Sequence, residues 1–289
     1  MPTPRIAYLA TGTRAIRCQA LFAAHTALAW RGELPLAIHV YTDAPAAFAE
    51  LAGAVTIEPL DPATERRWRG PWGFLYRMKP KLLEDLSGRH PSDPILLLDA
   101  DTYWRGAVGR AFERISGGQA VMHEREYFVG TLGTLQMRNF RRRMARASLR
   151  GRPIDVEAWM WNSGAVGLHP LHAPLIGDWI DYLDEVHPYN RKPIVEQYAI
   201  SWLLQRRLGA VVPCDDVLVH YWADKERHLA AILGALARVR TLDPAARHAW
   251  LRAEPLMIRG APPERSRGCF VTRMRESVAE RLPLLRREV

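Results

Sequence analysis

The first hundred residues alternate short apolar runs with longer stretches of helical periodicity. Residues 5–10, 36–42 and 54–58 have the apolar character of strands, whereas 14–30 carries apolar residues at helical spacing. The run of four aliphatic residues at 95–98 is the most apolar of the predicted strands, which indicates a central strand covered on both faces. Strands that alternate with helices in this way predict an α/β fold with a mostly parallel sheet.

The remainder of the chain follows a less regular order. Further elements are predicted as a helix over 74–86 despite Pro80, an apolar segment over 160–168, helices over 173–185 and 195–208, a strand over 217–221, and an amphipathic helix with Leu229, Ile232, Leu233 and Leu236 on one face. We find no internal repeat. The pattern therefore predicts a regular first half and a second half whose architecture is harder to define.

Composition places the chain among folded globular proteins. Of its 289 residues, 48% are hydrophobic and 25% charged, which argues against a disordered or low-complexity polymer. The net charge of +9 favours an anionic partner without selecting one. The three cysteines, Cys18, Cys214 and Cys269, are widely spaced, so they suggest neither a disulfide framework nor a zinc site.

The expected location is the cytoplasm. Arginines at positions 5, 14 and 17 interrupt the stretch where a signal peptide needs apolar residues. No run approaches the roughly 18 apolar residues of a membrane-spanning helix. Peripheral contact with the inner face of the membrane stays open, because anionic lipid is one of the partners that a basic chain attracts.

Two carboxylates follow the apolar run at 95–98. Asp99 and Asp101 stand two positions apart where a buried strand ends, and ligands of open α/β sheets bind beyond the carboxyl ends of the strands. Two such carboxylates can share a hard divalent cation, so Mn²⁺ or Mg²⁺ suits them better than zinc. The alternative is an Asp-rich turn whose carboxylates bond to nearby backbone amides.

The segment LLLDADT resembles the Asp-x-Asp motif of the GT-A fold nucleotide-diphospho-sugar glycosyltransferases, most closely the glycogenin-like group of family 8. The resemblance implies a Rossmann-like, mostly parallel sheet flanked by helices, with a less regular C-terminal acceptor half. It assigns ribose and metal contacts to Asp99, and to Asp101 the metal that bridges the donor diphosphate. The expected organisation is a glycosyltransferase domain over 1–240, with a nucleotide-binding half at about 1–120 and an acceptor half at about 121–240, and a basic helical tail over 241–289.

A basic helix precedes the Asp-x-Asp segment, as in this family. Arg77 and Lys79 lie nearest its start and are the preferred pair of donor-binding cations. A solvated helix face is the alternative for either residue. At the ends of the first two predicted strands, where family members contact the base and ribose, stand Thr11, Gly12, Thr13 and Asp43. The resemblance favours uridine as the base.

Two later segments resemble the parts of the family that surround the donor sugar. In the first segment, residues 161–168, the Asn162 amide would bond to sugar hydroxyls and Gly164 would let the backbone approach the ligand closely. In the second, Glu196 would bind sugar hydroxyls or act as a general base on the acceptor, and Gln197 would lie beneath the anomeric carbon. The structural alternative for the Asn162 segment is a common turn. The alternative for Glu196 is a carboxylate that complements the helix dipole.

The segment around His220 resembles the family's late histidine motif. There the histidine completes the metal shell and a downstream lysine binds a phosphate oxygen, which assigns these roles to His220 and Lys225. Here the lysine follows the histidine by five positions, whereas the family pattern has six with a glycine between. A single histidine after a strand also serves structural roles, but neutral imidazole is a good Mn²⁺ ligand.

Two arginine-rich segments complete the candidate chemistry. Residues 138–152 hold seven arginines and no acid; a helix there would place Arg138, Arg142, Arg146 and Arg150 on one face, with Phe140, Met144 and Ala147 turned elsewhere. This basic arm would suit an acidic acceptor, the phosphates of a lipid-linked glycan, an anionic membrane surface or merely solvent. Residues 264–289 hold seven arginines and four glutamates and receive no specific role. Nucleic acid is not expected, since no recognition motif accompanies the charge.

The resulting hypothesis is a metal-dependent glycosyltransferase. It would move a hexose from a nucleotide-diphosphate sugar, with UDP favoured, to a hydroxyl of a glycan or lipid-linked acceptor. One alternative is a sugar-1-phosphate nucleotidyltransferase, because residues 9–14 partly resemble that family's Gly-rich signature. The other is a non-catalytic fold relative that binds an anionic partner through the basic arm. The donor sugar, acceptor, linkage, stereochemical outcome and oligomeric state stay open.

Overall fold

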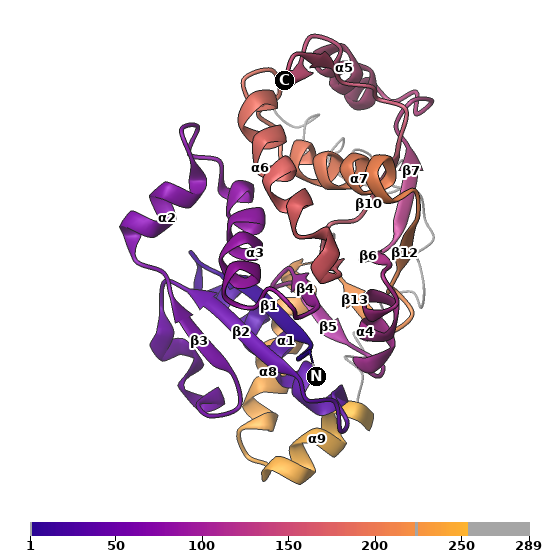
Figure 1. Cartoon of the computed structure of the whole chain (residues 1–289). Helices are drawn as coiled ribbons and strands as arrows, with labels where there is room; N and C mark the ends of the chain where they lie inside the picture. The colour runs from indigo at the N-terminus through magenta and orange to yellow at the C-terminus, as the bar shows by residue number, and fades with distance from the viewer. Residues whose placement is uncertain (1, 223–224, 254–289) are drawn as a thin grey trace, which may run out of the picture.

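A computed structural model describes residues 2–222 and 225–253. Its main sheet is built from β1 (Arg5–Ala10), β2 (Ala37–Thr42), β3 (Thr56–Pro59), β4 (Ile95–Leu98), β6 (Ala120–Met122), β11 (Ala165–Leu168) and β12 (Val211–Pro213). These seven strands run in the order β12-β6-β11-β4-β1-β2-β3 (Figure 1). The four from β3 to β4 are parallel, and β11 alone is antiparallel to its neighbours. The expected α/β class with a mostly parallel sheet is confirmed.

Helices cover both faces of this sheet. They are α1 (Arg14–Trp30), α2 (Pro62–Arg69), α3 (Met78–Arg89), α4 (Gly109–Ser116), α5 (Leu135–Met144), α6 (Pro174–Val186), α7 (Ile194–Leu208), α8 (Lys225–Val239) and α9 (Pro244–Ala253), with short 3₁₀ turns η1 (Pro45–Leu51), η2 (Leu75–Arg77) and η3 (Pro170–His172). The apolar cluster on one face draws on α3, α6 and α7, and the cluster on the other on α1, α4 and α8.

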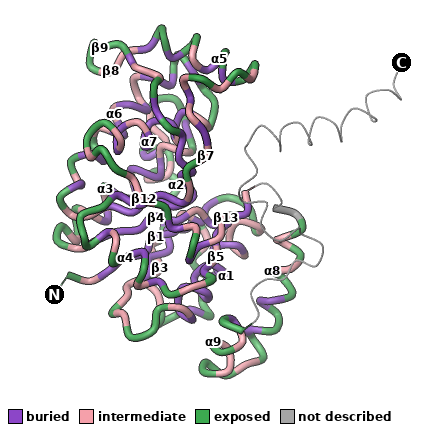
Figure 2. Tube along the Cα trace, turned by 90° about the vertical axis from the view of Figure 1, so that its right-hand side faces the viewer, coloured by how far each residue is buried: buried purple, intermediate pink, exposed green. Residues whose placement is uncertain are grey.

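Strand β4 lies at the centre of the sheet, as its composition predicts. All four residues are buried; Ile95 and Leu97 belong to one core cluster, and Leu96 and Leu98 to the other. Successive side chains of a strand point to opposite faces, so an all-aliphatic strand can fill two cores at once. Figure 2 shows the central strands β1 and β4 largely as buried segments. The carboxyl end of β4 is thereby fixed from both sides.

The remaining strands of the described residues form three two-stranded sheets. They pair β5 (Thr102–Trp104) with β13 (Leu218–His220), β7 (Arg125–Phe128) with β10 (Trp159–Trp161), and β8 (Ser148–Leu149) with β9 (Arg152–Pro153). The predicted helix over 74–86 is divided into η2 and α3. Pro80 lies in the first turn of α3, where a backbone N–H has no helical partner to lose.

The predicted helical face of four arginines is wrong. Helix α5 ends at Met144, and the chain then turns into the β8–β9 hairpin, where Arg150 and Gly151 have φ values of 50° and 74°. This left-handed backbone cannot continue a helix. Arg150 instead forms ion pairs with Asp178 and Asp181 of α6. The expectation that Phe140, Met144 and Ala147 turn elsewhere is confirmed, because all three are buried.

Helices α8 and α9 pack against α1 (Figure 1). Of the predicted apolar face of α8, Ile232 and Leu236 are buried, whereas Leu233 is 45% exposed and does not belong to it. The arginine-rich segment 264–289 lies outside the described residues. Within the described part of the chain, no helix has the length and apolar character needed to cross a membrane.

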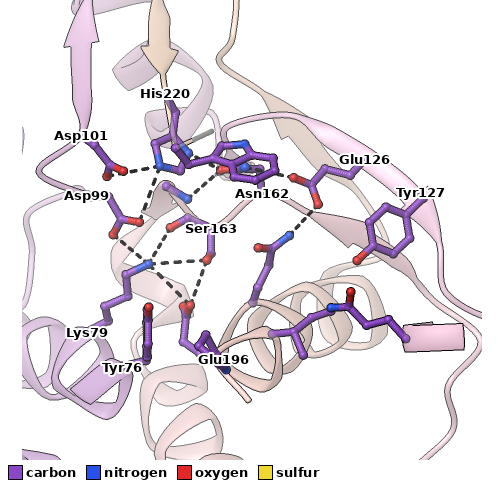
Figure 3. A pocket seen from close by; sticks show the side chains of 16 residues that line it. Tyr76, Lys79, Asp99, Asp101, Glu126, Tyr127, Asn162, Ser163, Glu196 and His220 are labelled. Atoms are coloured by element: carbon purple, nitrogen blue, oxygen red, sulfur yellow. Dashed lines mark hydrogen bonds and ion pairs between the residues drawn. The ribbon is translucent and has the colours of Figure 1, made fainter. Parts of the chain in front are cut away.

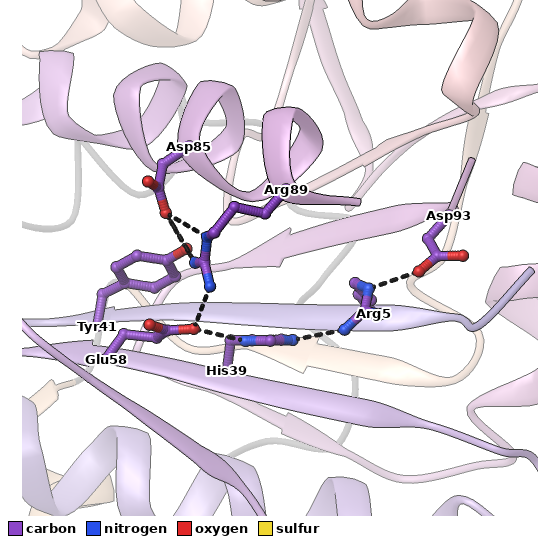
Figure 4. Close-up of polar contacts among 7 residues, drawn as sticks. All are labelled: Arg5, His39, Tyr41, Glu58, Asp85, Arg89 and Asp93. Atoms are coloured by element: carbon purple, nitrogen blue, oxygen red, sulfur yellow. Dashed lines mark hydrogen bonds and ion pairs between the residues drawn. The ribbon is translucent and has the colours of Figure 1, made fainter. Parts of the chain in front are cut away.

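A polar network lies near the amino ends of β1 and β4, away from Asp99 (Figure 4). Arg5 donates through Nε to Asp93 at 2.7 Å, and its Nη1 lies 3.0 Å from Nε2 of His39. A guanidinium only donates, so Nε2 accepts and the hydrogen of the neutral ring sits on Nδ1, which lies 2.9 Å from Glu58 Oε1. Burial, opposed by Glu58 and reinforced by the charge of Arg5, lowers the pKa of His39.

Acid is expected to destabilise the protein through His39. In the unfolded chain the imidazole takes up a proton near its ordinary pKa of about 6.5, whereas the folded ring resists protonation to a lower pH. Its stabilising contribution is therefore present above pH 6.5 and is lost as the pH falls toward the folded pKa. Urea unfolding at pH 7.5 and 5.0 should show a smaller drop in the free energy of unfolding for His39→Gln than for the wild type.

Tyr41→Phe serves as the control for this measurement. It removes a hydroxyl that donates to Asp85 in the same network but no group that titrates between pH 5 and 8. Its drop between the two pH values should equal that of the wild type. An equal drop in His39→Gln would show that His39 does not contribute to acid sensitivity.

Candidate metal and donor-sugar site

Three metal-ligating side chains converge beyond the carboxyl end of β4 (Figure 3). Asp99 and Asp101 follow β4 directly, and β13 pairs antiparallel with β5, which brings His220 opposite Thr102. Nε2 of His220 lies 3.4 Å from Asp101 Oδ1 and 3.9 Å from Asp99 Oδ2, and one ligand atom from each residue falls within 4.8 Å of the others. The structure thus brings together all three residues predicted as metal ligands.

The hydrogen bonds of Asn162 fix the orientation of the His220 ring. The amide oxygen of Asn162 lies 2.7 Å from His220 Nδ1 and also accepts from the Gly164 N–H at 2.9 Å. An amide oxygen only accepts, so Nδ1 carries a hydrogen and Nε2 is the ring nitrogen left to face the two carboxylates as a metal ligand. The Asn162 amide nitrogen is held in turn by Glu126 Oε1 at 3.0 Å. Two carboxylates and a bare imidazole nitrogen are a donor set that fits Mn²⁺ or Mg²⁺.

Lys79 supplies a buried positive charge beside this cluster. Its Nζ lies 2.8 Å from Asp99 Oδ1 and 3.6 Å from Glu196 Oε2, and it donates to the Ser163 carbonyl at 3.1 Å. Burial by itself lowers the pKa of Lys79, but the two neighbouring carboxylates outweigh burial and raise it above its ordinary value. The ammonium is therefore charged at neutral pH and lies beside the candidate metal ligand Asp99.

Arg77, the other cation of the predicted pair, lies elsewhere. Its Nε and Nη2 donate to the two carboxylate oxygens of Asp184 at 2.6 and 2.7 Å, and its Nη1 donates to the Trp68 carbonyl at 2.9 Å. Two residues apart on a helix are separated by roughly 200° of rotation, so Arg77 and Lys79 face nearly opposite directions. The structure therefore separates the two, and Arg77 joins η2, which leads into α3, to α6.

Glu196 is a buried carboxyl in the first turn of α7. It is 2% exposed and its Oε2 accepts from Ser163 Oγ at 3.0 Å, whereas Oε1 has no hydrogen-bond partner among the residues described. Burial raises the pKa of Glu196 to about 7, although Lys79 opposes the rise. A carboxyl that titrates near neutrality, with one oxygen unbonded, suits proton transfer or the binding of a hydroxyl.

Glu126 of β7 is a site residue that the sequence did not reveal. Its Oε1 accepts from the Asn162 amide, and its Oε2 accepts from Gln197 Nε2 at 2.8 Å (Figure 3). A single glutamate in a four-residue strand carries no local signal of such a role. The pairing of β7 with β10 places it beside Asn162, and this long-range contact is not legible in a sequence pattern.

These groups line a pocket of about 300 Å³. The predicted residues that line it are Lys79, Asp99, Asp101, Asn162, Gly164, Glu196, Gln197 and His220. The other lining residues, which the sequence did not indicate, are Tyr76, Glu126, Tyr127, Gln136, Ser163, Pro193, Ile194 and Trp222. A concave polar space of this size matches the lower end of small-molecule sites.

The predicted base-binding residues lie outside this pocket, at the ends of β1 and β2. Asp43 accepts from the Gly12 N–H at 3.0 Å and from Arg17 Nη1 at 3.2 Å. Thr13 caps α1, its hydroxyl accepting from Ile16 N–H, and Thr11 is buried directly after β1. Lys225 is the first residue of α8, and its side chain lies outside the described part of the structure.

Gly164 is required by the packing of His220. A Cβ added at this glycine would lie 2.2 Å from His220 Nδ1, which is too close for any side chain. The imidazole is held between Asn162 and the two aspartates, so it cannot move aside without losing its position in the cluster. The sequence singled out this glycine for close approach to a ligand, and in the structure the close approach is to the histidine.

Gly164→Ala is expected to weaken Mn²⁺ binding at least tenfold, because the displaced imidazole no longer reaches the shared position. Isothermal titration with MnCl₂ measures this. Gly177→Ala in α6 is the matched control, since a Cβ there meets nothing within 4 Å. The control should bind Mn²⁺ like the wild type and gain about 0.5–1 kcal/mol of stability. Equal Mn²⁺ affinity in both variants would contradict the assignment of His220.

Comparison with known proteins assigns this chain to no family. No family model matches the chain, and no curated protein matches its sequence. Among solved structures, mouse xyloside xylosyltransferase 1 in its apo form is similar, with a TM-score of 0.47 and 14% sequence identity. The similarity covers 74% of this chain and 85% of that one.

Proposed function

We propose that this protein is a metal-dependent glycosyltransferase that moves a hexose from a UDP-sugar to a hydroxyl of a glycan or lipid-linked acceptor. The observation that carries the proposal is the cluster of Asp99, Asp101 and His220, in which Asn162 fixes the imidazole with Nε2 toward the carboxylates. The cluster lies at the carboxyl end of a central strand, where α/β folds bind their ligands. The resemblance of LLLDADT to the Asp-x-Asp motif points the same way.

The surrounding residues support the binding of a sugar diphosphate. A divalent cation held by Asp99, Asp101 and His220 would act as a Lewis acid that neutralises the diphosphate leaving group. Lys79 adds a positive charge beside that position. By resemblance, Asp99 would also contact the ribose, and Thr11, Gly12, Thr13 and Asp43 would contact the base and ribose at the neighbouring strand ends, with Lys225 on a phosphate oxygen.

The acceptor side of the reaction would involve Glu196. Glu196 lines the pocket, its Oε1 has no hydrogen-bond partner among the described residues, and a pKa near 7 would let the carboxylate take a proton from an acceptor hydroxyl or orient that hydroxyl at physiological pH. Gln197 and Asn162 are held by the same Glu126 carboxylate, so their orientation toward the sugar would be set before the donor binds.

A thermal-shift panel of UDP, GDP, CDP and ADP, each with and without Mn²⁺, tests the proposal. A ligand at about 100 times its dissociation constant stabilises a protein by about 2.7 kcal/mol. We expect stabilisation by UDP that requires Mn²⁺. No shift with any nucleotide would favour a non-catalytic relative, and pyrophosphate release from UTP and a sugar phosphate would favour a nucleotidyltransferase.

A further inference from the structure

A second hollow, of about 380 Å³, adjoins the metal pocket. Gln136 and Ile194 line both, so the two spaces share a wall. The hollow lies between α5 and the segment that leads into α7. Figure 1 shows α5 at the same end of the molecule as α6 and α7. A molecule whose reacting end occupies the metal pocket would extend into this hollow.

One face of α5 forms its wall. Gln136, Asn139, Phe140 and Arg143 stand at the i, i+3, i+4 and i+7 positions of the helix, so their side chains share one side. The ring of Phe140 packs edge-on against the ring of Tyr198 in α7, with 5.1 Å between the ring centroids, which holds this face toward the hollow. The basic arm therefore contributes Arg143 to the hollow, rather than the four-arginine face predicted from sequence.

Two cations line this hollow without an acidic partner. Arg143 and Lys192 are exposed, and among the described residues neither takes part in an ion pair. Other arginines nearby are engaged: Arg141 donates to the Val129 and Leu132 carbonyls, and Arg150 pairs with α6. No carboxylate is among the described residues that line the hollow. The space therefore combines two uncompensated positive charges with the amides of Gln136 and Asn139.

We propose that this hollow binds a phosphoryl group carried by the acceptor of the transfer, an inference that rests on the proposed function. A phosphate monoester carries about two negative charges near pH 7 and three acceptor oxygens, which matches two cations and two amide side chains. A carboxylate carries one charge and leaves one cation uncompensated. A diphosphate donor would lie at Asp99, Asp101 and His220, across the shared wall, so the two anionic groups occupy separate places.

Binding of glucose 6-phosphate to the full metal-free chain, followed by NMR amide shifts at 0.15 M salt, tests the proposal. Arg143→Gln/Lys192→Gln is expected to raise the dissociation constant at least tenfold. Arg138→Gln/Arg146→Gln, which removes the same charge from two exposed arginines outside the hollow, should change it less than twofold. Glucose, glucuronate and inorganic phosphate should bind more weakly than glucose 6-phosphate to the wild type.

Equal losses in the two double variants would overturn the proposal, because they would indicate attraction to a diffuse basic surface. Tighter binding to neutral vesicles doped with phosphatidic acid than to glucose 6-phosphate, weakened by both double variants, would overturn it in favour of a membrane surface. Titration of Mn²⁺ with UDP into the same variants separates this test from that of the proposed function. Both double variants should retain wild-type affinity for Mn²⁺ and UDP. If the wild type itself does not bind Mn²⁺ and UDP, that result contradicts the proposed function alone.

Discussion

Replacement of Asp101 by asparagine is expected to lower turnover of a UDP-hexose by at least about 10³-fold. The asparagine keeps the shape of the side chain but removes one of the two carboxylates that face His220 Nε2. The cation that neutralises the diphosphate then loses a charged ligand. The fold should be retained, because asparagine fills the same space and removing one of two neighbouring negative charges relieves repulsion in the metal-free protein.

UDP release from a panel of UDP-hexoses, measured with excess Mn²⁺, gives the turnover, and urea unfolding gives the stability. Asp215→Asn is the control, because this partly exposed aspartate lies in the turn before β13 and does not line the pocket. It should turn over the donor like the wild type. Full turnover by Asp101→Asn, or its failure to fold, would remove Asp101 from the metal assignment.

Replacement of Lys79 by methionine should lower the free energy of unfolding by about 3–5 kcal/mol at pH 8. Methionine fills a similar volume, but Asp99 and Glu196 then lose the ammonium that compensates their charges in a buried place. The loss should be smaller at pH 5. Burial raises the pKa of Glu196 to about 7 with Lys79 present, and removal of the cation raises it further, so at pH 5 this carboxyl is neutral and needs no partner.

Lys81→Met is the matched control on the same helix. Lys81 pairs with Glu84 at the surface, where ion pairs contribute little, so stability should change by less than about 1 kcal/mol. The double variant Lys79→Met/Glu196→Gln should recover part of the loss, since one of the two carboxylates no longer lacks a cation. Equal losses at pH 5 and pH 8 would show that the charge of Glu196 is not what Lys79 compensates.

The parts of the fold that could be predicted are those with strong local patterns. The strand at 95–98 and the helix at 14–30 were located to the residue, because each presents an unbroken apolar or helical period. The two aspartates follow from the strand, since its carboxyl end is where an α/β sheet holds ligands. His220 was found through family resemblance, and its place opposite Thr102 depends on a β5–β13 pairing that no local pattern encodes.

The parts that could not be predicted depend on contacts between distant segments. Glu126 reaches Asn162 through the pairing of β7 with β10, and the second hollow forms where α5 packs on α7. The separation of Arg77 from Lys79 could not be predicted for a different reason. Both residues stand near the start of the predicted basic helix, but Arg77 ends η2 and Lys79 lies in the first turn of α3, and helical rotation points their side chains in opposite directions.

Asn162 connects His220, Gly164 and Glu126 through hydrogen bonds. The sequence favoured it as a ligand of sugar hydroxyls, whereas its amide oxygen serves His220 and Gly164 and its nitrogen serves Glu126. In the structure it acts as a positioning residue for the imidazole. Metal-ligating histidines commonly have such a partner on the second ring nitrogen, which fixes the tautomer.

The most direct test of the central claim is anomalous diffraction from crystals grown with MnCl₂ and UDP. The account predicts an anomalous peak roughly 2.0–2.6 Å from oxygens of Asp99 and Asp101 and from His220 Nε2, with the UDP diphosphate on the same ion. An absence of the peak at these three residues, with UDP bound elsewhere or not at all, would contradict it.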